Sequence, residues 1–155
     1  MLPAIDESKK RGRYKRIYDQ LSTLLNATDD VVSRMATVAA VLHHKMDGFF
    51  WTGFYLIHDG NLLVGPYQGP VACQVLAKDT GVCWSGINHG KTIIVPDVEQ
   101  FPGHIACDSR SRSEIVVPVR DKHQQIIAVL DVDSKLLDHF DEMDASGLEK
   151  IVGLI

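Results

Sequence analysis

The segment that decides the fold is residues 126–133, which read Ile126-Ile127-Ala128-Val129-Leu130-Asp131-Val132-Asp133. Its first five residues are apolar at both parities, which predicts a strand that is covered on both faces. Successive side chains of a strand point to opposite faces, so Asp131 and Asp133 share one face at the end of this strand. A carboxylate at the edge of a core costs several kcal/mol in desolvation unless it is protonated, paired or bound to a ligand.

A second apolar stretch, residues 115–119, precedes this strand, and the turn 121–124 is expected to join the two as a hairpin. The hairpin would bring Glu114 beside Asp131 and Asp133. Acids this close repel one another, so at least one of them should hold its proton near neutral pH. An alternative remains open, in which the strand end emerges into water and aspartate simply favours the turn.

The remaining elements are predicted outward from this hairpin. Apolar residues at helical spacing indicate two N-terminal helices within residues 8–44 and a C-terminal helix within 141–155, with Thr28 and Asp141 as expected N-caps. Further strands are expected at residues 50–57, 62–64, 71–76 and 92–95, with a short helix at 81–89. These elements predict an α+β fold: a central antiparallel sheet of about six strands, packed against N- and C-terminal helices. One domain, 1–155, is expected, with the sheet and active-site loops at about 49–134.

Charge and composition exclude several classes of protein. The net charge of −4 and the pI near 5.9 argue against nucleic acid as a partner. The sequence has no apolar segment long enough to span a membrane and no secretion signal at its N-terminus, so a cytoplasmic protein with reduced cysteines is expected.

The three cysteines, Cys73, Cys83 and Cys107, have three competing uses. Inert burial suits Cys83, which lies beside Trp84 on a short apolar helix. A zinc site could use all three with His104, but no Cys-x-x-Cys pair is present. In the third use, thiol chemistry, one cysteine attacks and another resolves it as a disulfide.

Cys107 lies in the long polar loop 96–113, and long loops in compact domains are usually functional. This position suits an attacking thiol. Nearby Arg110 and Arg112 could favour its thiolate or hold a substrate carboxylate; solvation of an exposed loop is the alternative.

An aromatic pair lies on another predicted strand. Trp51, Gly53 and Tyr55 share one strand face because they are spaced by two. A glycine between two large rings indicates a notch and favours a pocket, although an aromatic pair on a strand more often reflects plain core packing.

At these residues the sequence resembles a known family, the free methionine-R-sulfoxide reductases, which use a GAF-type domain. The resemblance extends from about residue 14 to residue 152. The matching segments are residues 51–56, 65–69, 72–73, 81–83, 101–108, 113–118 and 129–134.

The resemblance implies a role for each candidate residue. Cys107 would be the attacking cysteine, Cys73 its main resolving partner, and Cys83 an alternative resolver or relay. Three acids would bind and protonate the sulfoxide oxygen, and two aromatic residues would hold the methyl end of the substrate: Glu114, Asp131 and Asp133, then Trp51 and Tyr55. The implied reaction converts free methionine-R-sulfoxide to methionine through a cysteine sulfenic acid and a disulfide.

The resemblance implies no bound cofactor and no metal, since an external thioredoxin-like reductant would regenerate the thiols. A non-catalytic GAF-type sensor of a small ligand is the main alternative function. Whether the terminal helices pair two subunits as a homodimer stays open, as does whether Cys73 or Cys83 resolves the disulfide.

Overall fold

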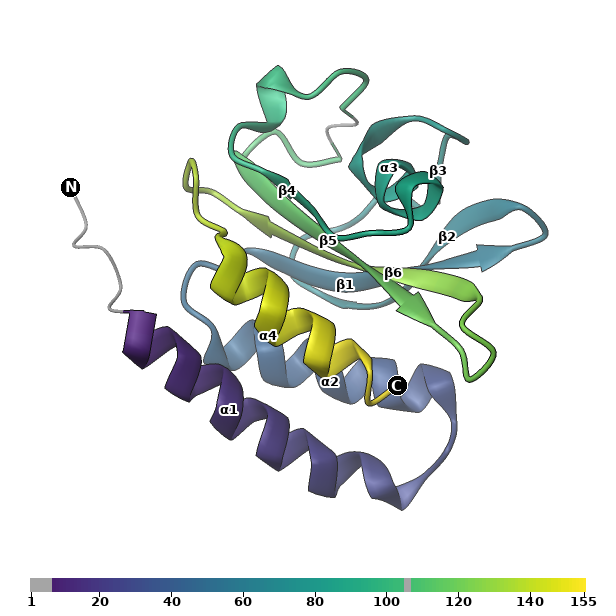
Figure 1. Cartoon of the computed structure of the whole chain (residues 1–155). Coiled ribbons are helices and arrows are strands. Elements are labelled where there is room, and N and C mark those ends of the chain that lie inside the picture. The colour runs from purple at the N-terminus through teal and green to yellow at the C-terminus, as the bar shows by residue number, and fades with distance from the viewer. Residues whose placement is uncertain (1–6, 105–106) are drawn as a thin grey trace.

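The computed structural model describes residues 7–104 and 107–155, and it contains one six-stranded antiparallel sheet (Figure 1). The strand order is β3-β2-β1-β6-β5-β4. The strands are β1 (Trp51–His58), β2 (Asn61–Gln68), β3 (Val75–Leu76), β4 (Ile93–Val95), β5 (Ser113–Arg120) and β6 (Ile126–Ser134). The predicted α+β fold with about six strands is therefore confirmed.

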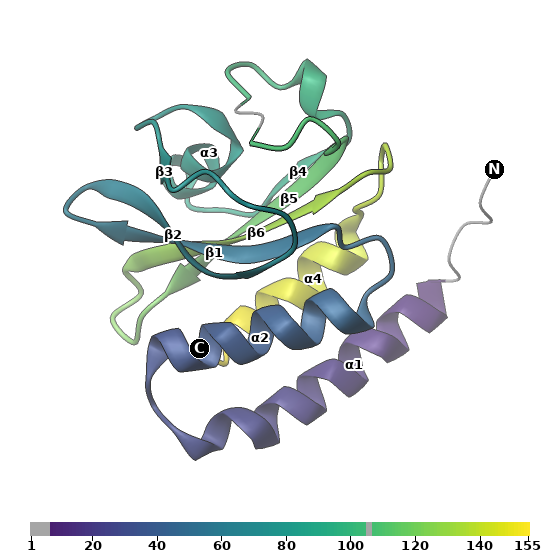
Figure 2. The same cartoon turned by 180° about the vertical axis from the view of Figure 1, so that it is seen from behind.

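Helices cover the sheet unequally. Helices α2 (Val31–Lys45) and α4 (Glu142–Val152) pack on one face, and α1 (Glu7–Leu24) lies outside them (Figures 1 and 2). The short helix α3 (Gly81–His89) and the long loops cover the other face. Two 3₁₀ turns, Leu25–Ala27 and Val98–Gln100, complete the secondary structure of the described residues. Within those residues, no helix has the length and apolar character needed to cross a membrane.

Strand β6 lies at the centre of the sheet, and both of its faces are covered, as its sequence predicts. Ala128, Leu130 and Val132 pack in the larger core under α2 and α4. Val129 packs in a second core under α3. The alternating pleat of one strand therefore contributes to two cores.

The strand register brings the candidate site residues together. The β5–β6 hairpin pairs Glu114 with Asp133, and β1 pairs Trp51 with the same Asp133. Residues directly opposite each other in neighbouring strands point to the same face of a sheet. The acids and the aromatic residue therefore share the face that α3 covers.

Three local expectations are wrong. Asp30, not Thr28, caps α2: its side chain accepts a hydrogen bond from the Ser33 amide, whereas the Thr28 hydroxyl accepts from the Asp30 amide. The expected strand at 71–76 is reduced to β3, because only its last two residues pair with β2, and Cys73 precedes it in irregular backbone.

The third wrong expectation is the open notch at Gly53. A Cβ atom placed there would lie 2.3 Å from the Tyr67 Cβ and 2.7 Å from the Trp51 Cη2. The glycine therefore allows close approach of two aromatic side chains and leaves no free space.

Candidate active site

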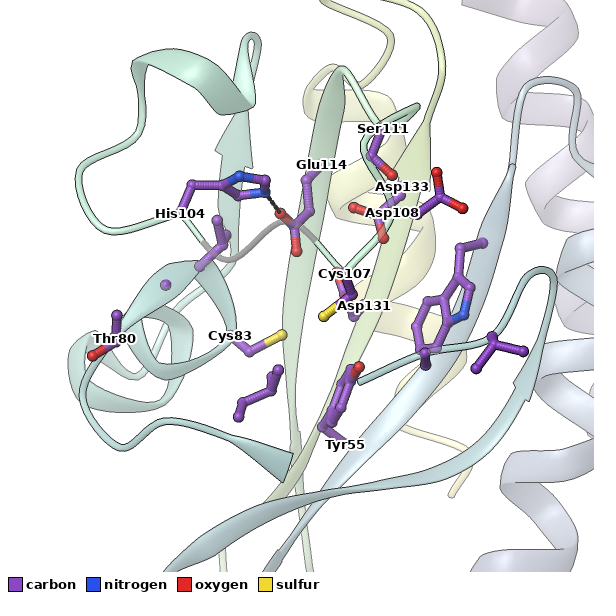
Figure 3. Close-up of a pocket in the computed structure, with 16 residues that line it drawn as sticks. Tyr55, Thr80, Cys83, His104, Cys107, Asp108, Ser111, Glu114, Asp131 and Asp133 are labelled. Carbon is purple, nitrogen blue, oxygen red and sulfur yellow. Dashed lines mark ion pairs between the residues drawn. The ribbon is translucent and has the colours of Figure 1, made fainter. Parts of the chain in front are cut away.

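A small cavity of about 50 Å³ lies between the sheet and α3 (Figure 3). Strands β1, β5 and β6 form its floor, and α3 and the loops around Cys73 and Cys107 form its walls. Its lining includes seven of the eight site residues expected from the sequence: Trp51, Tyr55, Cys83, Cys107, Glu114, Asp131 and Asp133. The eighth, Cys73, is attached to this wall through Cys107.

Cys73 and Cys107 form a disulfide across the pocket wall, with their Cα atoms 5.5 Å apart. Cys107 is exposed and Cys73 is half-buried, so the bond is near the surface. The Tyr55 hydroxyl donates a hydrogen bond to the Cys73 carbonyl oxygen at 3.1 Å, which ties the irregular segment around Cys73 to β1. The two cysteines therefore meet although 34 positions separate them in sequence.

Glu114 and Asp131 are buried and Asp133 is half-buried, and no lysine or arginine among the described residues pairs with any of the three. Glu114 is 5% exposed and Asp131 is 6% exposed. Within the described residues, the Asp131 Oδ1 has no hydrogen-bond partner. Burial, followed by the charge of Asp133, raises the pKa of Glu114 to about 8. Burial, followed by the charge of a neighbouring acid, also raises the pKa values of Asp131 and Asp133 well above their ordinary range. The site therefore holds protons on carboxyl groups at neutral pH.

Cys83 is the one cysteine outside the disulfide, and it is only 4% exposed. It extends from α3 so that its sulfur points toward the middle of the pocket (Figure 3). Burial, followed by the charge of Asp131, raises the pKa of its thiol well above the usual range. Cys83 is therefore a protonated thiol against the acids, and its role as a resolver or relay stays a prediction.

His104 is a pocket residue for which the sequence suggested only a weak zinc role. Its Nε2 lies 3.7 Å from the Glu114 Oε2, and burial lowers the pKa of its imidazole, so the neutral ring faces the acid. The feature of the sequence that could identify His104 as a pocket residue is its position just before Cys107 in the same loop.

The two arginines of this loop are exposed, which agrees with the alternative of a solvated loop. Arg110 donates two hydrogen bonds from its side chain to Asp108, at 3.0 and 2.7 Å, and lies over the Phe50 ring at 4.9 Å. These hydrogen bonds lower the pKa of Asp108 to about 2. Neither Arg110 nor Arg112 is among the described residues that line the pocket. In this structure the Arg110 side chain therefore pairs with the Asp108 carboxylate and not with a group in the pocket.

Three aromatic rings stack beside the pocket, and two of them, Trp51 and Tyr55, line it. Trp51 stacks on Tyr55 at 5.7 Å and on Tyr67 at 5.2 Å between ring centroids. The Trp51 indole also donates a hydrogen bond to the Pro70 carbonyl oxygen at 3.1 Å. Sequence reasoning missed Tyr67, which closes over Gly53 from the neighbouring strand.

Known proteins match both the fold and the length of the chain. A family model described as a GAF domain matches residues 28–155. GAF domain-containing protein A of Dictyostelium discoideum is 45% identical over 152 residues, which cover 97% of this chain and 95% of that protein. Free methionine-R-sulfoxide reductase of Escherichia coli is 36% identical over 139 residues, 90% of this chain and 84% of that protein.

A solved structure agrees with these sequence matches. The X-ray structure of free methionine-R-sulfoxide reductase from Neisseria meningitidis, in complex with its substrate, superposes with a TM-score of 0.89. That protein is 39% identical, and the match covers 99% of this chain and 90% of that one. The fold and the family model define a GAF domain protein. Within that class, the chain belongs to the free methionine-R-sulfoxide reductases, which confirms the resemblance read from its motifs.

Proposed function

We infer that this protein reduces free methionine-R-sulfoxide to methionine at the pocket closed by Cys107. One observation carries the inference: the disulfide of Cys73 and Cys107 forms a wall of the cavity whose floor holds Glu114, Asp131 and Asp133. An attacking thiol, a resolving thiol and a proton source are what sulfoxide reduction requires. The identity of the substrate is inferred from the family to which the chain belongs.

The first step joins Cys107 to the substrate. The sulfur of a sulfoxide is a poor electrophile until its oxygen is protonated, and Glu114 or a neighbouring aspartic acid donates that proton. The Cys107 thiolate attacks the sulfur, methionine leaves, and the oxygen remains on Cys107 as a sulfenic acid. The substrate gains two electrons, and Cys107 loses them.

The second step returns the enzyme to its thiol form. The Cys73 thiol condenses with the sulfenic acid of Cys107, which releases water and forms the disulfide. An external dithiol of the thioredoxin class then reduces this bond by thiol–disulfide exchange, so no bound cofactor is needed. The surface position of the disulfide supports access by a protein reductant.

The cavity size supports a cycle with two conformations. About 50 Å³ has room for on the order of four water molecules, which is too little for an amino acid. The disulfide form is therefore the state after turnover, and reduction frees the loops of Cys73 and Cys107 to admit substrate.

The acids also suit the substrate's free amino group. Without a lysine or arginine partner among the described residues, a carboxylate of this site can pair with an ammonium ion. Methionine sulfoxide inside a protein chain lacks that charge. We therefore expect selectivity for the free amino acid.

The test is a turnover assay with the reduced protein. Protein, dithiothreitol and free methionine-R-sulfoxide are incubated, and methionine is measured. A peptide with an internal methionine sulfoxide is the matched substrate control. No methionine from the free amino acid would favour the non-catalytic sensor, and equal rates on the peptide would refute the selectivity.

A further inference from the structure

Cys83 is buried against two carboxylic acids, although it takes no part in the disulfide. One ligand atom each from Cys83, Glu114 and Asp131 lies within 4.8 Å of the other two. These atoms come from three separate elements, α3, β5 and β6, and all three residues are buried. One sulfur and two oxygen ligands from the lining of the pocket therefore lie close together.

The second observation is the Asp131 carboxyl group. Its Oδ1 is buried and without a hydrogen-bond partner among residues 7–104 and 107–155. An unsatisfied buried polar atom destabilises the folded protein, so a ligand that pairs with it removes that cost on binding. The only basic side chain paired with Glu114 in the described part of the chain is the imidazole of His104.

We propose that Cys83, Glu114 and Asp131 form a binding site for a thiophilic divalent cation, of which Zn²⁺ and Cd²⁺ are the fitting class. Thiolate ligands select soft and borderline metals, and zinc accepts mixed sets of sulfur, oxygen and imidazole ligands. The His104 ring lies 3.7 Å from Glu114 but is not one of the three converging ligands, so solvent would complete the coordination.

The distances favour a larger cation. Tetrahedral Zn²⁺, with bonds of about 2.3 Å to sulfur and 2.0 Å to oxygen, puts such ligand atoms about 3.5 Å apart. The separations of up to 4.8 Å must therefore shrink by roughly 1 Å around zinc, through side-chain rotation. Cd²⁺ is larger and needs less contraction, which makes it the better probe.

Binding is a simple exchange of protons for metal. Each protonated ligand releases its proton to solvent as the cation binds, and no group is oxidised or reduced. The cation would take the place of the sulfoxide oxygen, so it would inhibit the reaction by competing with substrate. That consequence rests on the proposed function; the binding itself does not.

The oxidised protein gives a direct test, because Cys83 is then its only thiol. Cadmium chloride is titrated into oxidised protein without thiol reductant, and the thiolate-to-cadmium ultraviolet absorption is followed. We expect a band that saturates at one equivalent, disappears in Cys83→Ser, and persists in the Cys73→Ser/Cys107→Ser double variant. No band in the oxidised wild type, or a band that survives Cys83→Ser, would overturn the site.

Asp131→Asn tests the carboxylate ligands and keeps the thiol. Loss of an outer partner of a metal ligand typically costs 10–100-fold in affinity, and loss of a ligand should cost at least about that. Cadmium affinity unchanged in Asp131→Asn would therefore overturn the three-ligand site. Oxidised protein does not turn over substrate, so these results are independent of the proposed activity.

Discussion

The helical layer and the pocket face of the sheet bury acidic groups in opposite ways. Between α1 and α4, Asp144 is 1% exposed, yet it accepts hydrogen bonds from the Lys10 ammonium at 2.8 Å and from the Tyr14 hydroxyl at 2.6 Å. On the pocket face, Asp131 is similarly buried, but its Oδ1 has no partner among the described residues. Both oxygens of the carboxyl group are therefore paired between the helices, and one oxygen is left unpaired on the pocket face.

The difference separates stability from function. A buried carboxylate with a cation and several hydrogen bonds can stay charged and join two elements, as Asp144 joins α4 to α1. A buried acid without a cation is protonated or waits for a ligand. Local departures from polar satisfaction are expected at functional sites, and the one buried side-chain oxygen without a partner among the described residues lies on the pocket face.

The largest effect should come from Cys107→Ser. A serine hydroxyl is a far weaker nucleophile than a thiolate, so we expect turnover to be lost, although the residue is exposed and the fold should persist. Methionine formation and thermal unfolding are measured together. Full activity in this variant would remove Cys107 as the attacking group.

Cys73→Ser is the matched control. If Cys73 only resolves, this variant should form about one equivalent of methionine per protein and then stop, with Cys107 left as a sulfenic acid. Mass spectrometry of the product should detect the added oxygen. A disulfide between Cys107 and Cys83 in its place would show that Cys83 is the alternative resolver.

Asp144→Asn should cost stability and spare catalysis. Breaking a buried charge pair typically lowers the free energy of unfolding by about 3 kcal/mol or more, and the buried Lys10 ammonium would keep only its pair with the more exposed Asp141. Denaturant unfolding measures this loss, and the turnover rate of the folded variant should stay unchanged.

Asp19→Asn provides the control for this prediction. It removes an exposed pair with Lys15 on α1, and such pairs contribute less than about 1 kcal/mol. Equal losses of unfolding free energy in Asp144→Asn and Asp19→Asn would mean that the buried ion pair stabilises the protein no more than the exposed one.

Asp131→Asn should show the reverse pattern. Removing a positioned proton donor slows a reaction by about 10²-fold or more. The free energy of unfolding should change little, since burial raises the pKa of Asp131 and the neutral amide has nearly the size and shape of the protonated acid. Steady-state rates and denaturant unfolding are the two measurements. A full rate would mean that another residue donates the proton. A loss of stability like that of Asp144→Asn would mean that Asp131 stabilises the fold as much as Asp144 does.

The sequence predicts the shared face of the acids well, because strand parity is a local rule. Asp131 and Asp133 lie two positions apart, and the hairpin register then adds Glu114. The irregular segments were harder to predict. Cys73 was assigned to a strand because its neighbours are apolar, yet only Val75 and Leu76 find partners on the edge of the sheet.

Long-range contacts explain the other misses. The position of Tyr67 beside Gly53 depends on the β1–β2 pairing, and that of His104 beside Glu114 depends on the path of a long loop. The pairing of Arg110 with Asp108 is local. It could not be predicted because Cys107, the residue before Asp108 in the sequence, was another possible partner. Side chains in loops have no periodicity from which their direction can be predicted.

The smallest effect is expected from Tyr55→Phe, which removes one hydroxyl and keeps the aromatic ring. That hydroxyl donates to the Cys73 carbonyl oxygen, so its loss should loosen the segment around Cys73 while the ring keeps its stacking on Trp51. One hydrogen bond contributes about 1 kcal/mol, so disulfide formation should slow by about fivefold or less. Rapid quenching after one equivalent of substrate, followed by mass spectrometry, measures this step. A raised KM with unchanged disulfide formation would instead assign the hydroxyl to substrate binding. The hydrogen bond from β1 would then not be needed to position Cys73 for disulfide formation.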